Sequence, residues 1–77
     1  MNKTERKKLF QRVMAIVMKA AKISPDNLSE FARRFEACNG VPTSRENARY
    51  WKVNGVPTSR VQEFVKLAQS INPKFEL

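Results

Sequence analysis

Asn39-Gly40-Val41-Pro42-Thr43-Ser44-Arg45 is repeated without change as Asn54-Gly55-Val56-Pro57-Thr58-Ser59-Arg60, and residues 46–53 separate the two copies. In each copy, Asn-Gly tolerates the positive φ that is common at a helix C-terminus. The proline keeps the valine before it out of the α conformation. Thr-Ser then offers a side-chain oxygen to the free N–H groups of a new helix. The repeat therefore predicts one short helix, about residues 44–53, with a boundary signal at each end.

The helix between the copies has two unlike faces. Ser44, Ala48 and Trp51 share one side, and we expect Trp51 to anchor the helix in the core. The opposite side is polar and rich in hydrogen-bonding groups. It comprises Arg45, Glu46, Arg49 and Tyr50, with Asn47 and Lys52 at its borders.

Residues 4–22 predict a first helix, because apolar residues recur there at steps of three and four. They form two parallel rows, Leu9, Val13, Ile16, Ala20 and Ile23 beside Phe10, Met14, Val17 and Ala21. A second helix begins after a cap at either Ser24 or Asn27 and runs to about Cys38, before Asn39-Gly40.

A fourth helix is predicted from Thr58 or Ser59 to about Ser70. Since no segment has the alternating pattern of a strand, the fold class is all-α, a compact four-helix domain over residues 1–77. A basic segment, residues 1–8, precedes its core, and an apolar tail, residues 72–77, follows it. The large apolar residues of the tail, Phe75 and Leu77, dock either on their own domain or on a second copy of the chain.

Composition restricts the function classes. The chain has no histidine and a single cysteine, Cys38, so an internal disulfide is excluded and a reducing, cytoplasmic location is expected. Cys38 is expected to be a small buried apolar residue. We find no nucleophile–base pair and no metal-ligand set, so we predict no cofactor, no metal, no small-molecule substrate and no catalytic residue. An enzyme is the least expected class.

Membrane association is a less favoured alternative. The apolar run at residues 13–18 is too short for a secretory signal or a bilayer span. A basic amphipathic helix can lie on a membrane surface, but the other helices are expected to cover the apolar stripe of the first.

The charge favours a polyanionic partner. The formal net charge is +8, and residues 1–22 hold seven basic residues against one acidic residue. An excess of this kind favours association with nucleic acid without specifying a fold.

The chain resembles the Cro and repressor helix-turn-helix proteins of lambdoid phages over about residues 9–77. Residues 28–35 correspond to the first motif helix, and residues 44–51 to the recognition helix. Ala32 matches the family's small residue in the first helix, while Ala48 and Trp51 match the inward apolar and aromatic positions of the second. Two departures are a longer link between the motif helices and a fifth helix reduced to residues 73–77.

The resemblance implies a sequence-specific transcriptional regulator that binds a double-stranded DNA operator as a homodimer and acts by occupying it. The base-contacting positions it implies are Arg45, Glu46, Asn47, Arg49 and Tyr50. The phosphate-contacting positions are Thr43, Ser44, Lys52 and Arg60. Phe75 and Leu77 are the expected dimer contact. The basic segment 1–8 either adds phosphate contacts or reaches along the duplex as an arm.

Two other functions use the same features. The antitoxin of a toxin–antitoxin pair can use the same DNA-binding domain, and composition does not separate the two. A small RNA-binding module is suggested by the charge together with Tyr50-Trp51, because RNA readers stack bases on exposed aromatic rings.

Overall fold

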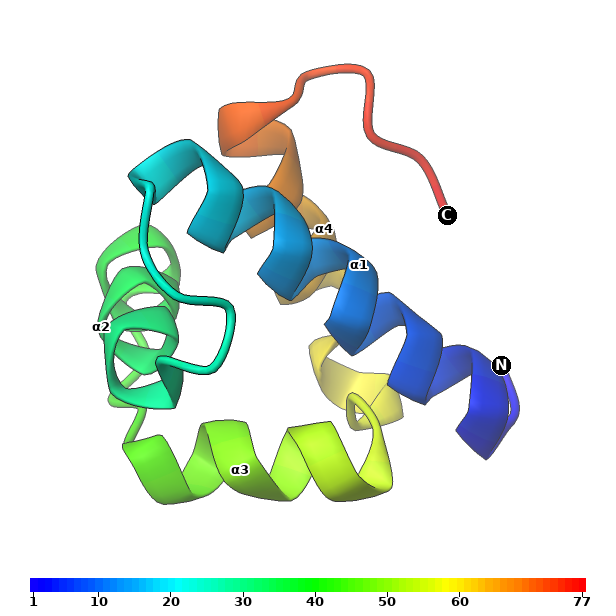
Figure 1. Cartoon of the computed structure of the whole chain (residues 1–77). Coiled ribbons are helices and arrows are strands. Elements are labelled where there is room, and N and C mark those ends of the chain that lie inside the picture. The colour runs from blue at the N-terminus through cyan, green and yellow to red at the C-terminus, as the bar shows by residue number, and fades with distance from the viewer.

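The computed structural model describes all 77 residues and contains four α-helices, one 3₁₀ turn and no strand (Figure 1). Its elements are α1 (Lys3–Ala21), α2 (Leu28–Asn39), α3 (Arg45–Asn54), η1 (Thr58–Arg60) and α4 (Val61–Ile71). α1 packs mainly against α4 and α3, and α2 packs mainly against α3 and α4. The predicted all-α, four-helix fold is confirmed.

α1 begins with a reciprocal cap. The Asn2 side chain accepts a hydrogen bond from the Glu5 backbone N–H at 2.9 Å, and the Glu5 carboxylate accepts one from the Asn2 N–H at 3.0 Å. Residues 3–8 therefore form the first turns of α1. The alternative in which segment 1–8 extends as an arm is wrong, because the cap satisfies the free N–H groups and the helix packs on the protein.

Asn27, and not Ser24, caps α2. Its side-chain oxygen accepts a hydrogen bond from the Glu30 N–H at 3.0 Å. The helix ends at Gly40, which is left-handed with φ 69°. Cys38 is half-buried rather than buried, at the margin of the core.

The two copies of the repeat fold differently after their glycines. In the first copy Ser44 caps α3, as predicted. In the second, neither Thr58 nor Ser59 provides a side-chain cap, and the chain forms η1 before α4 begins at Val61. That predicted cap is wrong. Gly55 adopts φ 91° and ψ 165° against the first turns of α1, so the chain leaves α3 along a different path.

Five aromatic rings form the centre of the core: Phe10, Phe31, Phe35, Trp51 and Phe64. The Phe35 ring centroid lies 5.1 Å from Trp51 and 4.9 Å from Phe64. Contacts in this range add to the hydrophobic stabilisation of buried rings. The predicted burial of Trp51 is confirmed, since only 5% of it is exposed.

The buried side of α1 differs in part from the predicted rows. Leu9, Phe10, Val13, Met14 and Val17 are buried as expected, together with Met18. Ala20 is exposed, while Ile16 and Ile23 are half-buried. The fully buried positions thus end at Met18, before the last turn of the helix. No helix combines the length and the apolar character needed to cross a membrane.

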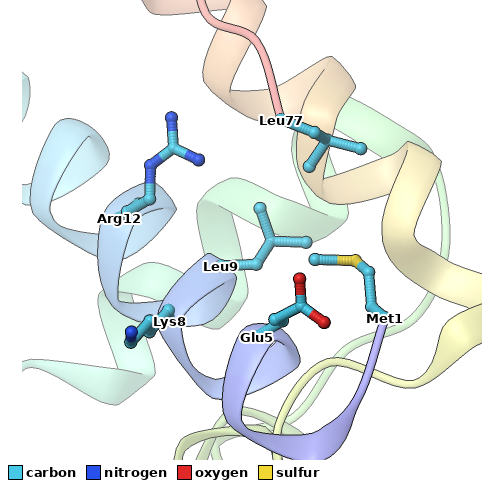
Figure 2. A pocket seen from close by; sticks show the side chains of 6 residues that line it. All are labelled: Met1, Glu5, Lys8, Leu9, Arg12 and Leu77. Atoms are coloured by element: carbon cyan, nitrogen blue, oxygen red, sulfur yellow. The ribbon is translucent and has the colours of Figure 1, made fainter.

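The C-terminal tail docks on its own chain through Phe75. This ring is only 4% exposed, and the Arg12 guanidinium lies 4.6 Å from its centroid. Gln69 Nε2 donates to the Phe75 carbonyl at 3.1 Å. Phe75 is therefore not free for a dimer contact, and that prediction is wrong for this residue. Leu77 is 60% exposed, and in Figure 2 its side chain faces Met1 above Leu9.

Candidate nucleic-acid interface

α3 lies along one edge of the molecule, with the other helices all on one side of it (Figure 1). Ala48 and Trp51 are the buried residues of α3 and pack against the core. The residues on the other side remain in solvent; Tyr50 is 61% exposed and Val53 is 57% exposed. The helix can therefore approach a second macromolecule without any rearrangement of the fold.

We call the exposed side of this helix the α3 outer face. It consists of Arg45, Glu46, Arg49, Tyr50 and Val53, all of them exposed. The structure contains three ion pairs, and none of them includes a residue of α3. The guanidinium donors and the Glu46 carboxylate are consequently available to a ligand. Four of the five predicted base-contacting residues lie together on this face.

Asn47, the fifth predicted base-contacting residue, is engaged in the N-terminal cap of α3. Its Oδ1 accepts hydrogen bonds from the Ser44 backbone N–H and the Ser44 hydroxyl, both at 2.9 Å. The Ser44 Oγ accepts in turn from the Asn47 N–H at 3.2 Å. A bidentate contact with adenine uses both the oxygen and the nitrogen of an asparagine amide, and here the oxygen is already engaged.

The predicted phosphate contacts do not form one group. Thr43 closes the link before α3: its N–H donates to Glu36 Oε1 at 2.7 Å and its hydroxyl donates to the Val41 carbonyl at 2.8 Å. Arg60 is half-buried and pairs with Glu63 at 2.8 Å. Both residues therefore have structural partners.

Lys52 differs from these two. Lys52 is exposed, forms no ion pair, and borders a hollow beside Pro25 and Asp26. Ser44 is exposed at the N-terminus of α3, where the backbone N–H groups and the helix dipole favour an anion. Lys52 remains open to a phosphate at a border of the outer face, whereas the N–H and the hydroxyl of Ser44 are engaged with Asn47.

Val53 lies on this face but is not among the predicted base-contacting residues. It follows Arg49 by four positions and Glu46 by seven, which places all three on one line of the helix. Glu46, Arg49, Tyr50, Val53 and Asn54 line a shallow hollow together. Its helical spacing could have identified Val53 as a site residue, but the prediction was limited to polar side chains.

Charged residues of α2 are paired among themselves. The Glu30 carboxylate accepts hydrogen bonds from Arg33 and Arg34. The hydrogen bond from Arg33 lowers the pKa of Glu30 and raises the pKa of Arg33. The Glu30 carboxylate therefore offsets part of the positive charge of the two α2 arginines.

Comparison with protein-family models, curated proteins and solved structures gives no match for this chain.

Proposed function

We propose that this protein is a sequence-specific DNA-binding regulator that places the α3 outer face in the major groove and acts by occupying its operator. The observation that carries the proposal is the division of α3 into a buried side, anchored by Trp51, and an exposed side free of internal partners. An α-helix with side chains is about 10–12 Å wide, and the major groove of B-DNA is about 12 Å wide.

The side chains of this face suit the edges of base pairs. Arginine donates to the two acceptors of guanine, so Arg45 and Arg49 are assigned to guanines. Glu46 accepts from the amino group of cytosine. The methyl groups of Val53 suit the methyl group of thymine. Tyr50 adds a hydroxyl at the border of the face, where it reaches either a base or a phosphate.

The positive charge of the protein favours contact with the phosphates of the duplex backbone. The net charge of +8 favours any duplex. Lys52, in the last turn of α3, and the helix N-terminus after Ser44 are assigned to phosphates, which set the register of the helix without reading sequence.

We place a homodimer contact at Leu77. Its side chain, Met1 and Leu9 form the apolar floor of a hollow rimmed by Glu5, Lys8 and Arg12 (Figure 2). Because a two-fold interface brings the same surface of both copies together, a second copy can set its own Leu77 against this apolar floor. Leu77→Glu is expected to abolish dimers in sedimentation on a palindromic operator, whereas Ile71→Glu, outside the hollow, leaves them intact. Dimers of unchanged strength in Leu77→Glu would exclude this contact.

Selection of bound sites from random duplex DNA tests the main proposal. We expect enrichment of a defined sequence, in two inverted halves if the protein binds as a dimer. Binding without enrichment would show that the outer face does not read bases. Absence of duplex binding at low salt would reject the proposal as a whole.

The exposed ring of Tyr50 supports RNA binding as a second candidate, because bases stack on such rings. The support is limited to one ring, since Trp51 is buried. Titration with single-stranded RNA separates the two functions. Tight binding of single strands in preference to duplex DNA would favour this candidate.

A further inference from the structure

A second hollow lies beside the outer face, where the first turns of α1 meet the end of α3. It is lined by Lys3, Arg6, Tyr50, Asn54, Gly55 and Pro57. Tyr50 also lines the hollow on the outer face, so the two adjoin along this side chain. A group bound in the second hollow would therefore lie next to a ligand that contacts α3.

The cations of this hollow have no acidic partner. Lys3 and Arg6 are three positions apart on α1, so they share one side of the helix, and neither takes part in an ion pair. The nearby acid of α1, Glu5, is engaged in the cap with Asn2. Figure 2 places its carboxylate beside Met1 and Leu9, at the other hollow. The positive charge is thus uncompensated within the protein.

Direct backbone contacts fix the position of these cations relative to α3. The Val56 N–H donates to the Arg6 carbonyl at 3.3 Å, and Arg6 Nη1 donates to the Val56 carbonyl at 3.3 Å. A Cβ at Gly55 would lie 3.0 Å from the Cβ of Arg6 and 3.1 Å from the Lys7 nitrogen. This close approach needs a glycine. It holds the backbone at the start of α1 against the end of α3, so the positions from which Lys3 and Arg6 project are fixed relative to the outer face.

We infer that this hollow binds one phosphodiester group of the DNA backbone, at the wall of the groove that α3 enters. Lys3 and Arg6 supply the positive charge, and the exposed hydroxyl of Tyr50 supplies a donor. The inference rests on the proposed function and adds to it a fixed phosphate site on α1, which sets how far α3 can slide along the groove. Such a contact adds affinity on any sequence without reading bases.

The salt dependence of duplex binding tests this site. Each phosphate contact contributes about 0.9 to the slope of log K against log salt concentration on B-DNA. Lys3→Gln should reduce the slope by about 0.9 and weaken selected and random duplexes by the same factor. The matched control is Lys19→Gln, an exposed lysine near the other end of the same helix, which should leave the slope unchanged. Equal slopes for the wild type and Lys3→Gln would overturn the inference while the proposed function stands.

Arg6→Gln is less suitable alone, because it also removes the bond to Val56 and can weaken the fold. Arg6→Lys keeps the charge and should retain the slope. If the wild type binds no duplex, the proposed function fails and titration with inorganic phosphate, followed by NMR at constant ionic strength, decides the site. Saturable shifts of the Asn54 and Gly55 amides that Lys3→Gln removes and Lys19→Gln retains would support an anion site. Their absence, or identical shifts in both variants, would overturn it.

Discussion

Ser44 and Asn47 cap α3 reciprocally. The Ser44 Oγ accepts from the Asn47 N–H at 3.2 Å, and the Asn47 Oδ1 accepts from the Ser44 N–H at 2.9 Å. Two free donors at the helix start are satisfied at once, in the manner of a capping box with asparagine in place of glutamate. Asn47 therefore determines where α3 begins and how its first turn is oriented, and a direct contact with a base would cost the protein this cap.

Loss of either capping side chain should destabilise the fold. Asn47→Ala and Ser44→Ala are each expected to lower the free energy of unfolding by roughly 1 kcal/mol. Because the two residues share the same hydrogen bonds, the double variant should lose less than the sum of the single losses. Urea denaturation of the four proteins measures this coupling. Strictly additive losses would mean that the reciprocal cap does not stabilise the helix in solution.

Trp51 and Tyr50 are adjacent in the chain but should differ sharply in their effect on stability. The Trp51 ring lies 5.1 Å from Phe35 and 5.2 Å from Phe64, whereas Tyr50 projects into solvent. Trp51→Ala should lower the free energy of unfolding by about 3–5 kcal/mol, and Tyr50→Ala by no more than about 0.5 kcal/mol. Chemical denaturation compares them, and similar losses would contradict the orientation of α3.

Local signals were sufficient to predict the helices, because each boundary depends on residues close by in the sequence. Gly40, Ser44 and Gly55 mark the ends of α2 and α3 much as predicted. The same heptapeptide failed to predict a second side-chain cap, because the conformation after Gly55 depends on Arg6 and Lys7. These residues are distant in sequence, and no local pattern reports their approach.

The two glycines of the repeat provide a matched pair of substitutions. Gly40 is left-handed with φ 69°, and a Cβ added there meets no atom within 4 Å. Gly55 has φ 91° and ψ 165°, a region that is almost restricted to glycine, and a Cβ there meets the backbone of α1.

Gly40→Ala should therefore lower the free energy of unfolding by roughly 1–2 kcal/mol, the cost of a left-handed alanine. Gly55→Ala should lower it by more, because about 1–3 kcal/mol of backbone strain is added to a steric contact. Thermal and urea denaturation of both variants checks the order. Equal losses would indicate that the close approach of α1 and α3 is relaxed in solution.

Arg49 should contribute sequence preference, and Lys52 should contribute affinity alone. Arg49→Ala is expected to cost about 1–3 kcal/mol on the selected site and to relax the preference at one base position. Lys52→Ala should weaken selected and random duplexes alike, with a lower salt slope. Competition binding on single-base variants of the selected site separates the two effects. If Arg49→Ala weakens all duplexes equally, its guanidinium contacts a phosphate and not a base.

The polar side of α3 could be predicted from its helical wheel, but the availability of each side chain could not. Arg45 and Arg49 are free, whereas Arg60, the last residue of the repeat, is paired with Glu63. The burial of Phe75 depends on where α1 places Arg12 and on the turn after α4. Pairings of this kind arise from the tertiary arrangement, so they separate ligand-binding residues from structural ones only when the fold is known.

The ion pairs of Glu30 predict how stability changes in acid. The hydrogen bond from Arg33 lowers the pKa of Glu30 in the folded state, so the unfolded chain binds a proton at higher pH than the folded protein does. Stability from this group is complete above the unfolded pKa of about 4.3 and is lost as the pH falls through the lowered folded pKa. Glu30→Gln should thus be less stable than the wild type at neutral pH, with a difference that narrows as the pH falls below about 4.3. Glu76→Gln, at an unpaired carboxylate, should show little change in either range. A Glu30→Gln deficit that stays constant down to strong acid would show that the ion pairs do not form in solution.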